Sequence, residues 1–344
     1  MASTRWRKAG GFAPLILAAS AAAAAEEAVE VVSPPVEVRR EAIPATPLAG
    51  ARLVRRLDAA VPGVTWSNVP LRHVLRQVSD GYAVAVLCDR RIDPTAAPEV
   101  TAANVPLRDV LRGIAAEAGG ELRVVGNVAY VGPAEAARVV RTLAELRRQE
   151  LASGGPRLAG RRAELLNVKT VAWGDLTEPT EVLRLVAGRY GLAVENPDLL
   201  PHDLWAGATL PEISAPEMLT LLLVQYDLTF AWGDDLRSVR LVPLPGDLSR
   251  IAVERPYPFQ GRPDETIAAL RDRFGEFDAE VADRQIVVRG PLELHEALGE
   301  VLAGRPQARS RPATGDAAPL SRRRFTLAVS RVPARAVMEK LEQS

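Results

Sequence analysis

The chain has 344 residues, of which 47% are hydrophobic and 25% are charged, so its length allows two or three globular modules. Its 43 basic and 43 acidic residues cancel, which removes the excess of positive charge that is typical of nucleic-acid-binding proteins. The single cysteine, Cys88, excludes an intramolecular disulfide and a Cys-x-x-Cys redox pair, and the three histidines are far apart in sequence. The composition therefore disfavours thiol–disulfide oxidoreductases and most metalloenzymes.

The N-terminus has the three parts of a secretory signal peptide over residues 1–25. Arg5, Arg7 and Lys8 form the positive start, an apolar run covers residues 12–25, and the small residues before Glu26 suit cleavage after Ala25. The alternative is an uncleaved membrane anchor. A spanning helix needs about 20 strongly apolar residues, whereas this run is short and rich in alanine. The sequence thus predicts an exported protein of the periplasm or cell envelope.

A sequence repeat dominates the next part of the chain. Residues 64–76 recur as residues 100–112, and ten of the thirteen positions are identical. In each copy an extended segment precedes a proline that suits the first turn of a helix. Apolar residues at helical spacing then form one stripe on each predicted helix. These stripe residues are Leu71, Val74, Leu75 and Val78 in the first copy, and Leu107, Val110, Leu111 and Ile114 in the second.

Each predicted helix is followed by a glycine and a short apolar strand. In the second copy, Gly126-Asn127 separates two apolar runs, which is a strong signal for a β-hairpin. Neither half can bury its apolar stripe alone, so we expect residues 64–132 to form one small α+β domain.

A degenerate second copy is predicted over residues 165–243. Its extended segment is expected at residues 165–168, its helices after Pro179 and Pro216, and its closing hairpin at Gly233-Asp234-Asp235. Residues 133–163 are interpreted as a helix followed by a Gly/Pro linker.

The remaining segments differ from this pattern. Residues 251–304 predict the order βαββα, with Asp264 as the cap of the first helix. Residues 26–50 are interpreted as a Pro-rich disordered leader and residues 305–321 as a Pro/Arg linker. Residues 323–344 predict only one strand, Phe325–Val329, and one helix, which make an incomplete half of the repeated unit.

These motifs resemble a known family. The pattern in Val69-Pro70-Leu71 and Val105-Pro106-Leu107, and less cleanly in Ala215-Pro216, resembles the short N-terminal (STN) domain shared by secretins and TonB-dependent receptors. The segment from Asp283 to Gly290 is similar to part of the KH-like ring-building N-domains of secretins. The resemblance implies tandem α+β modules, each a short sheet packed on two helices, that act in protein–protein interaction in the periplasm.

No motif predicts a catalytic, cofactor-binding or metal site. His295-Glu296 begins like a zinc-protease helix, but Gly299 stands where the second histidine is needed, so we expect a solvated helical histidine. Lys169-Thr170 lacks a glycine-rich phosphate loop. Asp234 and Asp235 are expected to serve turn chemistry.

The aromatic residues, the cysteine and one basic cluster also have simple interpretations. Cys88 is expected to be a packed thiol, and Trp66 and Trp205 are expected to be core or rim residues, although a sugar or peptide groove is the alternative. The similar boxes at Trp173 and Trp232 are attributed to coincidence. The arginines between Arg305 and Arg324 suit either an anionic partner, such as acidic lipid, or a solvated linker.

The sequence therefore predicts an exported protein without catalytic activity, which interacts with envelope proteins or with itself. We expect a secretin N-domain-like component or adaptor of an outer-membrane secretion or transport assembly, with peripheral association with the outer membrane left open. Neither nucleic acid nor a small-molecule substrate is indicated. The alternatives are a protein that binds peptidoglycan or another envelope glycan and, more remotely, an exported enzyme.

Export can be tested with the chain's own N-terminus. In a Gram-negative host we expect the protein in the periplasmic fraction, with Glu26 or a residue within two positions of it at its start, because the apolar run is too short to remain as an anchor. N-terminal sequencing of the purified protein measures this. An intact Met1 in washed membranes would instead establish the anchor.

Overall fold

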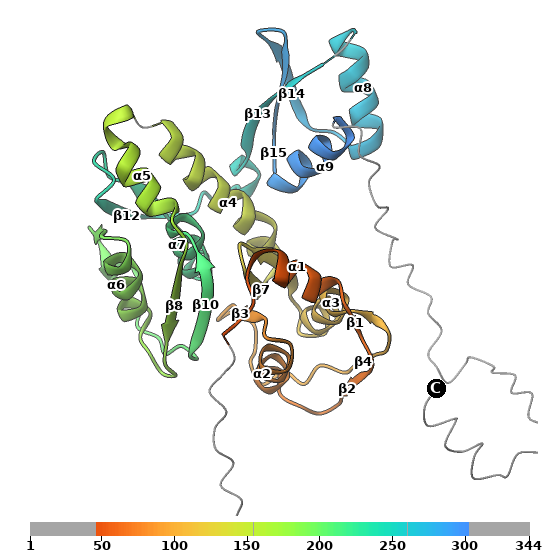
Figure 1. Ribbon diagram of the computed structural model, residues 1–344, viewed down its shortest axis with the longest axis vertical. Coiled ribbons are helices and arrows are strands. Elements are labelled where there is room, and N and C mark those ends of the chain that lie inside the picture. The colour runs from red at the N-terminus through yellow and green to blue at the C-terminus, as the bar shows by residue number, and fades with distance from the viewer. Residues whose placement is uncertain (1–45, 154, 260, 303–344) are drawn as a thin grey trace, which may run out of the picture. The chain divides into compact units, whose positions relative to one another are not determined.

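The computed structural model describes residues 46–153, 155–259 and 261–302 (Figure 1). The predicted signal peptide, most of the predicted leader, the linker at 305–321 and the half-unit at 323–344 lie outside these residues. The described chain is a mixed α+β structure with several small sheets, as the sequence predicts. Within it, no helix is both long enough and apolar enough to cross a bilayer.

The first segment contains three helices and seven short strands. They are α1 (Gly50–Asp58), β1 (Ala60–Val61), β2 (Val64–Trp66), α2 (Leu71–Tyr82), β3 (Ala85–Cys88), β4 (Val100–Ala102), β5 (Val105–Pro106), α3 (Leu107–Glu117), β6 (Glu121–Val125) and β7 (Val128–Gly132). Strands β2 and β4 pair antiparallel, β3 pairs parallel to β7, and β6 pairs antiparallel to β7. The predicted hairpin is confirmed, since Val125 and Val128 pair across Gly126-Asn127.

The predicted helical stripes are buried in the first segment. All eight stripe residues of α2 and α3 are at most 6% exposed, and they belong to one apolar cluster. Helix α1, which the sequence analysis did not predict, adds Leu53 and Leu57 to this cluster. The end of the predicted leader also contacts the domain, because the Leu48 N–H donates to the Ala83 carbonyl at 2.8 Å.

The second segment begins with a long helix. Its elements are α4 (Ala134–Ser153), α5 (Ala159–Leu166), β8 (Lys169–Trp173), α6 (Pro179–Arg189), β9 (Ala193–Val194), β10 (Ala208–Ile213), α7 (Ala215–Leu223), β11 (Leu228–Trp232) and β12 (Ser238–Pro243). Strands β8 and β10 pair antiparallel, β9 pairs parallel to β12, and β11 pairs antiparallel to β12. These pairings correspond to three of the four in the first segment, with β8, β9, β10, β11 and β12 in the places of β2, β3, β4, β6 and β7, whereas the antiparallel pair β1–β5 has no counterpart.

The first strand of this segment lies later than predicted. Residues 165 and 166 belong to α5, and β8 starts at Lys169, so the extended segment expected at 165–168 is wrong. Residues 159–166 consist mostly of strong helix formers, and Arg161 pairs with Glu164 one turn later at 2.7 Å. Leu165 points into the core from the helix.

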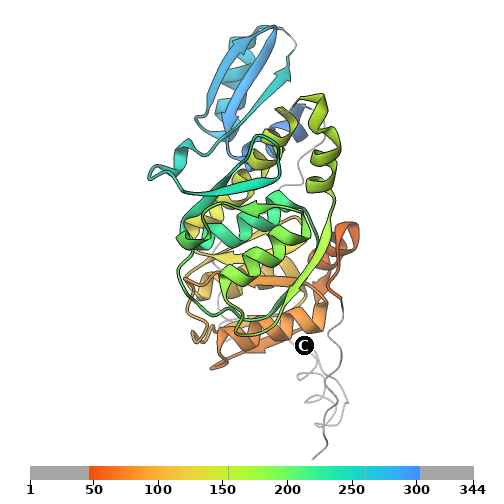
Figure 2. The ribbon, with the colours of Figure 1, turned by 90° about the vertical axis from the view of Figure 1, so that its left-hand side faces the viewer.

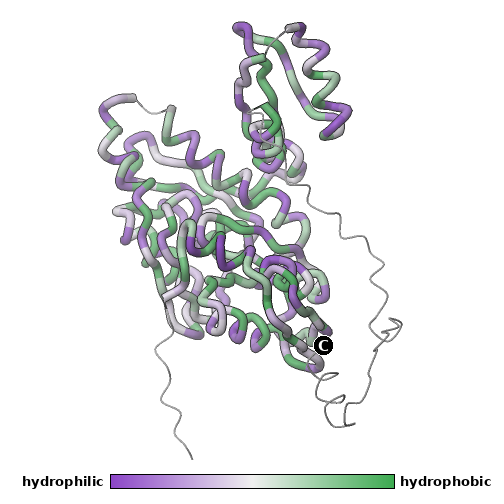
Figure 3. The backbone as a smooth tube through the Cα atoms, turned by 45° about the vertical axis from the view of Figure 1, so that its right-hand side comes forward, coloured by the Kyte–Doolittle hydropathy of each residue, from purple (hydrophilic) through white to green (hydrophobic). Residues whose placement is uncertain are grey.

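Helix α4 joins the two segments into one core instead of linking them at the surface. Its residues Ala137, Val140 and Leu143 pack in the same apolar cluster as Tyr130 of β7 and Leu219 of α7. The sheet β3–β7–β6 therefore has one face against α2 and α3 and the other against α4. Figures 1 and 2 show α4 next to α7, and Figure 3 shows hydrophobic and hydrophilic residues alternating along the helices. The helix expected within residues 133–163 is thus α4, and it lies in the core.

The third segment has the predicted order βαββα. It contains β13 (Val253–Pro258), α8 (Pro263–Phe274), β14 (Asp278–Ala282), β15 (Gln285–Gly290) and α9 (Leu292–Leu302), and β15 is the central strand. Asp264 is not the cap of α8, because the helix starts at Pro263 and Arg262 occupies the capping position. Proline suits the first helical position since its missing N–H costs no hydrogen bond there.

A buried carboxylate lies at the end of β3. The Asp89 side chain is fully buried and accepts two hydrogen bonds from the Arg91 guanidinium, at 2.9 and 2.8 Å, and another from the Tyr130 hydroxyl. The pKa of Tyr130 is raised, first by burial and then by the Asp89 charge. The pKa of Arg91 is also raised, mainly by its hydrogen bonds to Asp89.

The same loop contacts the second segment. Arg91 donates to the Val224 carbonyl at 2.9 Å and pairs with Asp227 at 2.6 Å. The backbone N–H of Arg90 donates to the Gln225 side chain at 3.1 Å. Asp89 therefore orients an arginine that ties β3 to the end of α7.

Replacement of Asp89 tests this junction. We expect Asp89→Asn to lower the free energy of unfolding by about 3 kcal/mol, the low end for a broken buried ion pair, because the Arg91 side chain keeps 26% exposure. Urea unfolding of the variant and of Asp80→Asn, a change at an exposed aspartate, measures it. Equal stability of the two variants would show that the buried pair is not a structural determinant.

Candidate functional site

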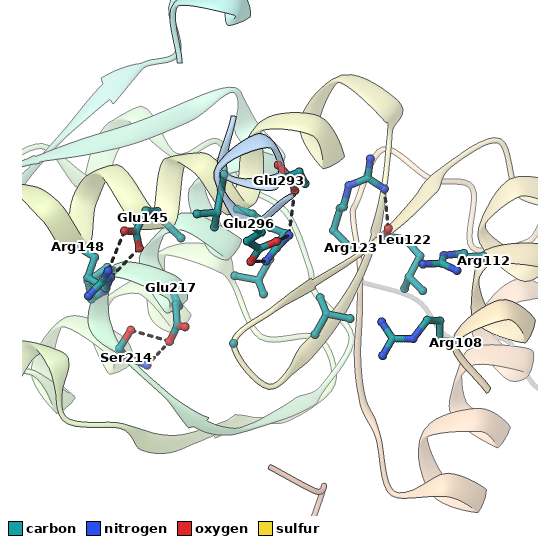
Figure 4. Close-up of a pocket in the computed structure, with 17 residues that line it drawn as sticks. Arg108, Arg112, Leu122, Arg123, Glu145, Arg148, Ser214, Glu217, Glu293 and Glu296 are labelled. Atoms are coloured by element: carbon teal, nitrogen blue, oxygen red, sulfur yellow. Dashed lines mark hydrogen bonds and ion pairs between the residues drawn. The ribbon is translucent and has the colours of Figure 1, made fainter. Parts of the chain in front are cut away.

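A groove of about 610 Å³ lies among the described residues. It is lined by α3, β6, α4, the N-terminal end of α7 and the N-terminal end of α9 (Figure 4). Nine charged residues line it: Arg108, Arg112, Arg123, Arg141, Arg148, Glu145, Glu217, Glu293 and Glu296.

One end of the groove is basic. Arg108 and Arg112 project from α3, and Arg123 projects from β6. Each is paired with a partly exposed carboxylate at 2.6–2.8 Å. The partners are Asp58, Asp109 and Glu121, respectively. The spacing of Arg108 and Arg112 puts both on one face of α3, one helical turn apart.

The other end contains the carboxylates. Arg141 of α4 contacts Glu293 at 3.2 Å and Glu296 at 2.9 Å, and it thereby connects α4 to α9. Burial acts to raise the pKa of Glu145, but hydrogen bonds from Arg148 and Arg255 outweigh it and hold this pKa below its usual value. Glu145 therefore stays ionised between Arg148, which lines the groove, and Arg255 of β13.

The tip of the β6–β7 hairpin lies at the start of α7. Ser214 and Glu217 form a capping box there, in which the Ser214 N–H donates to the Glu217 carboxylate at 2.9 Å. Gly126 has a φ of +55°, and a Cβ at this position would lie 2.8 Å from Glu217 Oε1. Only glycine suits both the turn and the close approach. The Val125 end of β6 is thus the acidic end of the groove.

Strand β6 is an edge strand, and its free edge faces the groove. Among the described residues it pairs with β7 alone, and Leu122, Arg123, Val124 and Val125 all line the cavity. The Leu122 carbonyl accepts a hydrogen bond from Arg123 Nη1 at 2.9 Å, so the side chain of the strand covers part of its own edge. The groove therefore combines fixed charges with unpaired backbone groups, which suits binding of an extended polypeptide.

The structure corrects the expectation for His295. Its side chain is 1% exposed, not solvated, and its ring stacks on Tyr257. Nε2 lies 2.8 Å from the Val253 carbonyl, which can only accept, so Nε2 carries the proton and Nδ1 accepts from the Tyr257 hydroxyl at 2.9 Å. Its neighbour Glu296 pairs with Arg141.

The other residues singled out in the sequence are occupied by packing contacts. Cys88 is half-buried, and burial together with the neighbouring Asp89 raises its pKa to about 12. Trp66 and Trp205 are 8% and 7% exposed, as expected for packed residues. Trp66 Nε1 donates to Gln77 at 2.8 Å, and Trp205 packs between Trp173 and Tyr226.

The remaining candidates also have local partners. Lys169 Nζ donates to the Arg189 carbonyl at 2.7 Å. Asp235 accepts from the Arg237 N–H at 2.8 Å, which confirms the expected turn chemistry. Trp173 and Trp232 donate to unrelated carbonyls. The arginines from Arg305 to Arg324 lie outside the described residues. No cluster of three or more His, Cys, Asp or Glu with metal-site geometry occurs in the described ranges.

Sequence analysis did not identify the groove or Asp89. The groove residues come from five elements that are distant in sequence, and the only local signal is the pair Arg108 and Arg112 on one helical face. Asp89 directly follows a short apolar strand, where a polar residue normally marks a loop. Comparison with protein-family models, curated proteins and solved structures found no match to this chain.

The buried histidine makes stability dependent on pH. Burial is the main cause that lowers the pKa of His295 below its ordinary value of 6.5, and the Arg255 charge lowers it further. The hydrogen bond to the Val253 carbonyl acts in the opposite direction but does not outweigh burial. The folded state favours the neutral ring, whereas the unfolded chain binds a proton below about pH 6.5. Stability is thus complete above that pH and decreases as the pH falls toward the lowered pKa.

We expect this loss to approach 1.4 kcal/mol per pH unit at most, the limit for one proton. Denaturant unfolding at pH 7 and pH 5 measures it for the wild type, His295→Gln and His202→Gln. His202 is a suitable control because its side chain is 75% exposed. Only His295→Gln should show a smaller pH dependence. An unchanged dependence in that variant would contradict the assignment.

Proposed function

We propose that the protein is an exported, non-catalytic protein-interaction component of the cell envelope, organised like the N-domains of secretins. In this role it is a component or adaptor of an outer-membrane secretion or transport assembly, and its groove holds an extended segment of a partner protein. The proposal rests chiefly on one observation, the free edge of β6 inside a charged groove.

The geometry of the edge supports polypeptide binding. Main-chain groups of an edge strand provide affinity for any extended chain, and the walls provide selectivity through side chains. Here the walls carry three arginines at one end, and four glutamates together with Arg141 and Arg148 at the other.

The organisation of the chain gives further support. The first two segments share three strand pairings, and the third has the βαββα order. This arrangement agrees with the resemblance to the STN and KH-like domains of secretins, in which Val69-Pro70-Leu71 and Val105-Pro106-Leu107 carry the repeated motif. Tandem modules of this kind suit binding through sheet edges or module faces.

Site-specific photo-crosslinking tests the proposal. A photoreactive phenylalanine analogue replaces Arg112, whose side chain lines the groove and is 59% exposed. In cells that export the chain naturally, we expect a defined protein adduct at this position. The matched control places the analogue at Leu185, which is 44% exposed on α6.

The adduct should also disappear when Val124→Pro removes an N–H group from the edge of β6. A label that is equal at both positions, or that persists with proline, would contradict groove binding. Retention on isolated sacculi without any protein adduct would favour the alternative of glycan binding.

A further inference from the structure

One wall of the groove belongs to the third segment, which has a core of its own. Leu292, Glu293 and Glu296 of α9 line the groove, whereas its other lining residues belong to the first two segments. Among the described residues, the apolar cluster of the third segment shares no member with the two larger clusters. The connection is short, since Ile251 still packs in the core of the second segment and β13 begins at Val253. A change of backbone direction there can move the third segment as a body.

Arg141 of α4 is the ionic link between α9 and the rest of the groove. It contacts Glu293 at 3.2 Å and Glu296 at 2.9 Å, and its side chain is 23% exposed. Burial acts to lower the pKa of Arg141, but the contacts with Glu296 and Glu293 raise it above its ordinary value. A charge that is largely removed from water is costly unless an opposite charge lies beside it. Arg141 therefore needs a carboxylate partner.

Two more polar contacts hold the third segment on the same part of α4. The Leu292 N–H donates to the Thr142 hydroxyl at 3.1 Å, and Arg255 of β13 pairs with Glu145 at 2.6 Å. Glu145 also pairs with Arg148 at 2.7 Å, so it keeps an ionic partner if the third segment moves away. The two carboxylates that Arg141 contacts both leave with α9.

Separation of the two surfaces leaves a charge on each of them. The contact contains three arginines and three glutamates and is neutral as a whole; its members are Arg141, Arg148, Arg255, Glu145, Glu293 and Glu296. Without the third segment, α4 keeps two of the arginines and one of the glutamates, which gives a net charge of +1. An anion on another chain can restore neutrality there. Opening of this contact is therefore favoured by a chain that brings a carboxylate to Arg141.

The carboxylates of α9 lie on the path of a chain that follows the edge of β6. Figure 4 shows Glu293 and Glu296 between Arg123 of β6 and the pair formed by Glu145 and Arg148. An extended chain beside β6 therefore meets α9 at its contact with α4. Such a chain can replace that contact, because an Asp or Glu side chain offers the same carboxylate group as α9 does.

We propose that α9 is a movable wall of the groove. Its carboxylates occupy Arg141 when the groove is empty, and a carboxylate of an acidic partner segment takes their place when that segment binds beside β6. The inference rests on the proposed function, because the occupant is the extended partner segment of that proposal. It adds a requirement for the partner, an Asp or Glu that reaches Arg141. The partner shifts the population toward the open groove by its preference for that state.

Two blocked peptides test the carboxylate requirement, Thr-Val-Asp-Val-Thr and its Asn analogue, both of strand-forming character. Hydrogen bonds to charged groups are stronger than neutral ones, so we expect the Asp peptide to bind the full chain about tenfold more tightly in calorimetric titration. Arg141→Gln should remove this difference. Arg138→Gln, the same change of charge at an exposed position one turn earlier on α4, should keep it. Equal loss in both variants, or no binding of the Asp peptide, would overturn the requirement.

The double variant Glu293→Gln, Glu296→Gln tests the movable wall itself. Without these carboxylates the closed state is less populated, so the uncharged Asn peptide should also bind more tightly, by at least about threefold. A rigid wall predicts a different result, because loss of two negative charges would then improve binding of the Asp peptide alone. That result would overturn the proposal.

Double electron–electron resonance measures the movement of the third segment. In a Cys88→Ser background, spin labels are attached at Arg240→Cys on β12 and Glu280→Cys on β14, two exposed positions in the second and third segments. We expect the Asp peptide to add a second distance population. The double glutamine variant should populate the same distance without peptide. One unchanged distance under both conditions would overturn the proposal, and this measurement decides if Arg141→Gln proves unfolded in a thermal melt.

The proposed function and the movable wall can fail separately. A groove crosslink at Arg112 together with an unchanged distance would leave the proposed function intact and remove the movable wall. Absence of that crosslink would remove the proposed function whatever the distance shows.

Discussion

The ion pair between Asp89 and Arg91 is the constraint on which the arrangement of the first two segments depends. A carboxylate removed from water costs several kcal/mol unless hydrogen bonds and an opposite charge replace its hydration. Asp89 has these hydrogen bonds and this opposite charge only when Tyr130 of β7 and the Arg91 guanidinium are in place. The same guanidinium donates a hydrogen bond to the Val224 carbonyl. The burial of the Asp89 side chain therefore depends on the position of the end of α7. Because α7 packs on α4 and its N-terminus meets the β6–β7 hairpin, the same coupling helps to define the groove.

The third segment is attached by different forces. Its apolar cluster is separate from the two larger clusters, and its contacts with α4 are mainly polar. Arg255 pairs with Glu145, Arg141 pairs with Glu293 and Glu296, and the Leu292 N–H donates to Thr142 at 3.1 Å. Polar interfaces of this kind permit relative motion more readily than apolar ones, and exposed ion pairs weaken with salt. The part of the acidic wall that α9 supplies, Glu293 and Glu296, therefore depends on electrostatics more than the basic wall on α3 does.

Local patterns in the sequence predict local structure here, and tertiary contacts account for the failures. The stripes through Leu75 and Leu111 and the Gly126-Asn127 hairpin follow from periodicity and turn chemistry, which act over a few residues. Leu165-Leu166 fits a strand equally well as a short apolar run, and only the helix-forming residues before it favour α5. His295 resembles a surface histidine because its partners, Val253 and Tyr257, lie about 40 residues away in the chain. The groove combines five elements, so no single stretch of sequence contains its pattern.

Two edge strands, β14 and β6, are protected from uncontrolled strand pairing in different ways. An exposed strand edge invites uncontrolled pairing, and proteins commonly guard it with charge. Strand β14 is such an edge, and exposed Asp278 and Glu280 lie on it. Strand β6 is guarded differently, since α3 and α4 flank it and the Arg123 side chain covers the Leu122 carbonyl. Flanking helices exclude a second sheet but admit a single extended chain. A side-chain guard can also rotate away at little cost, because Arg123 retains Glu121 as its ionic partner. An edge with such walls and such a guard resists aggregation and leaves room for one strand, as the proposed binding mode requires.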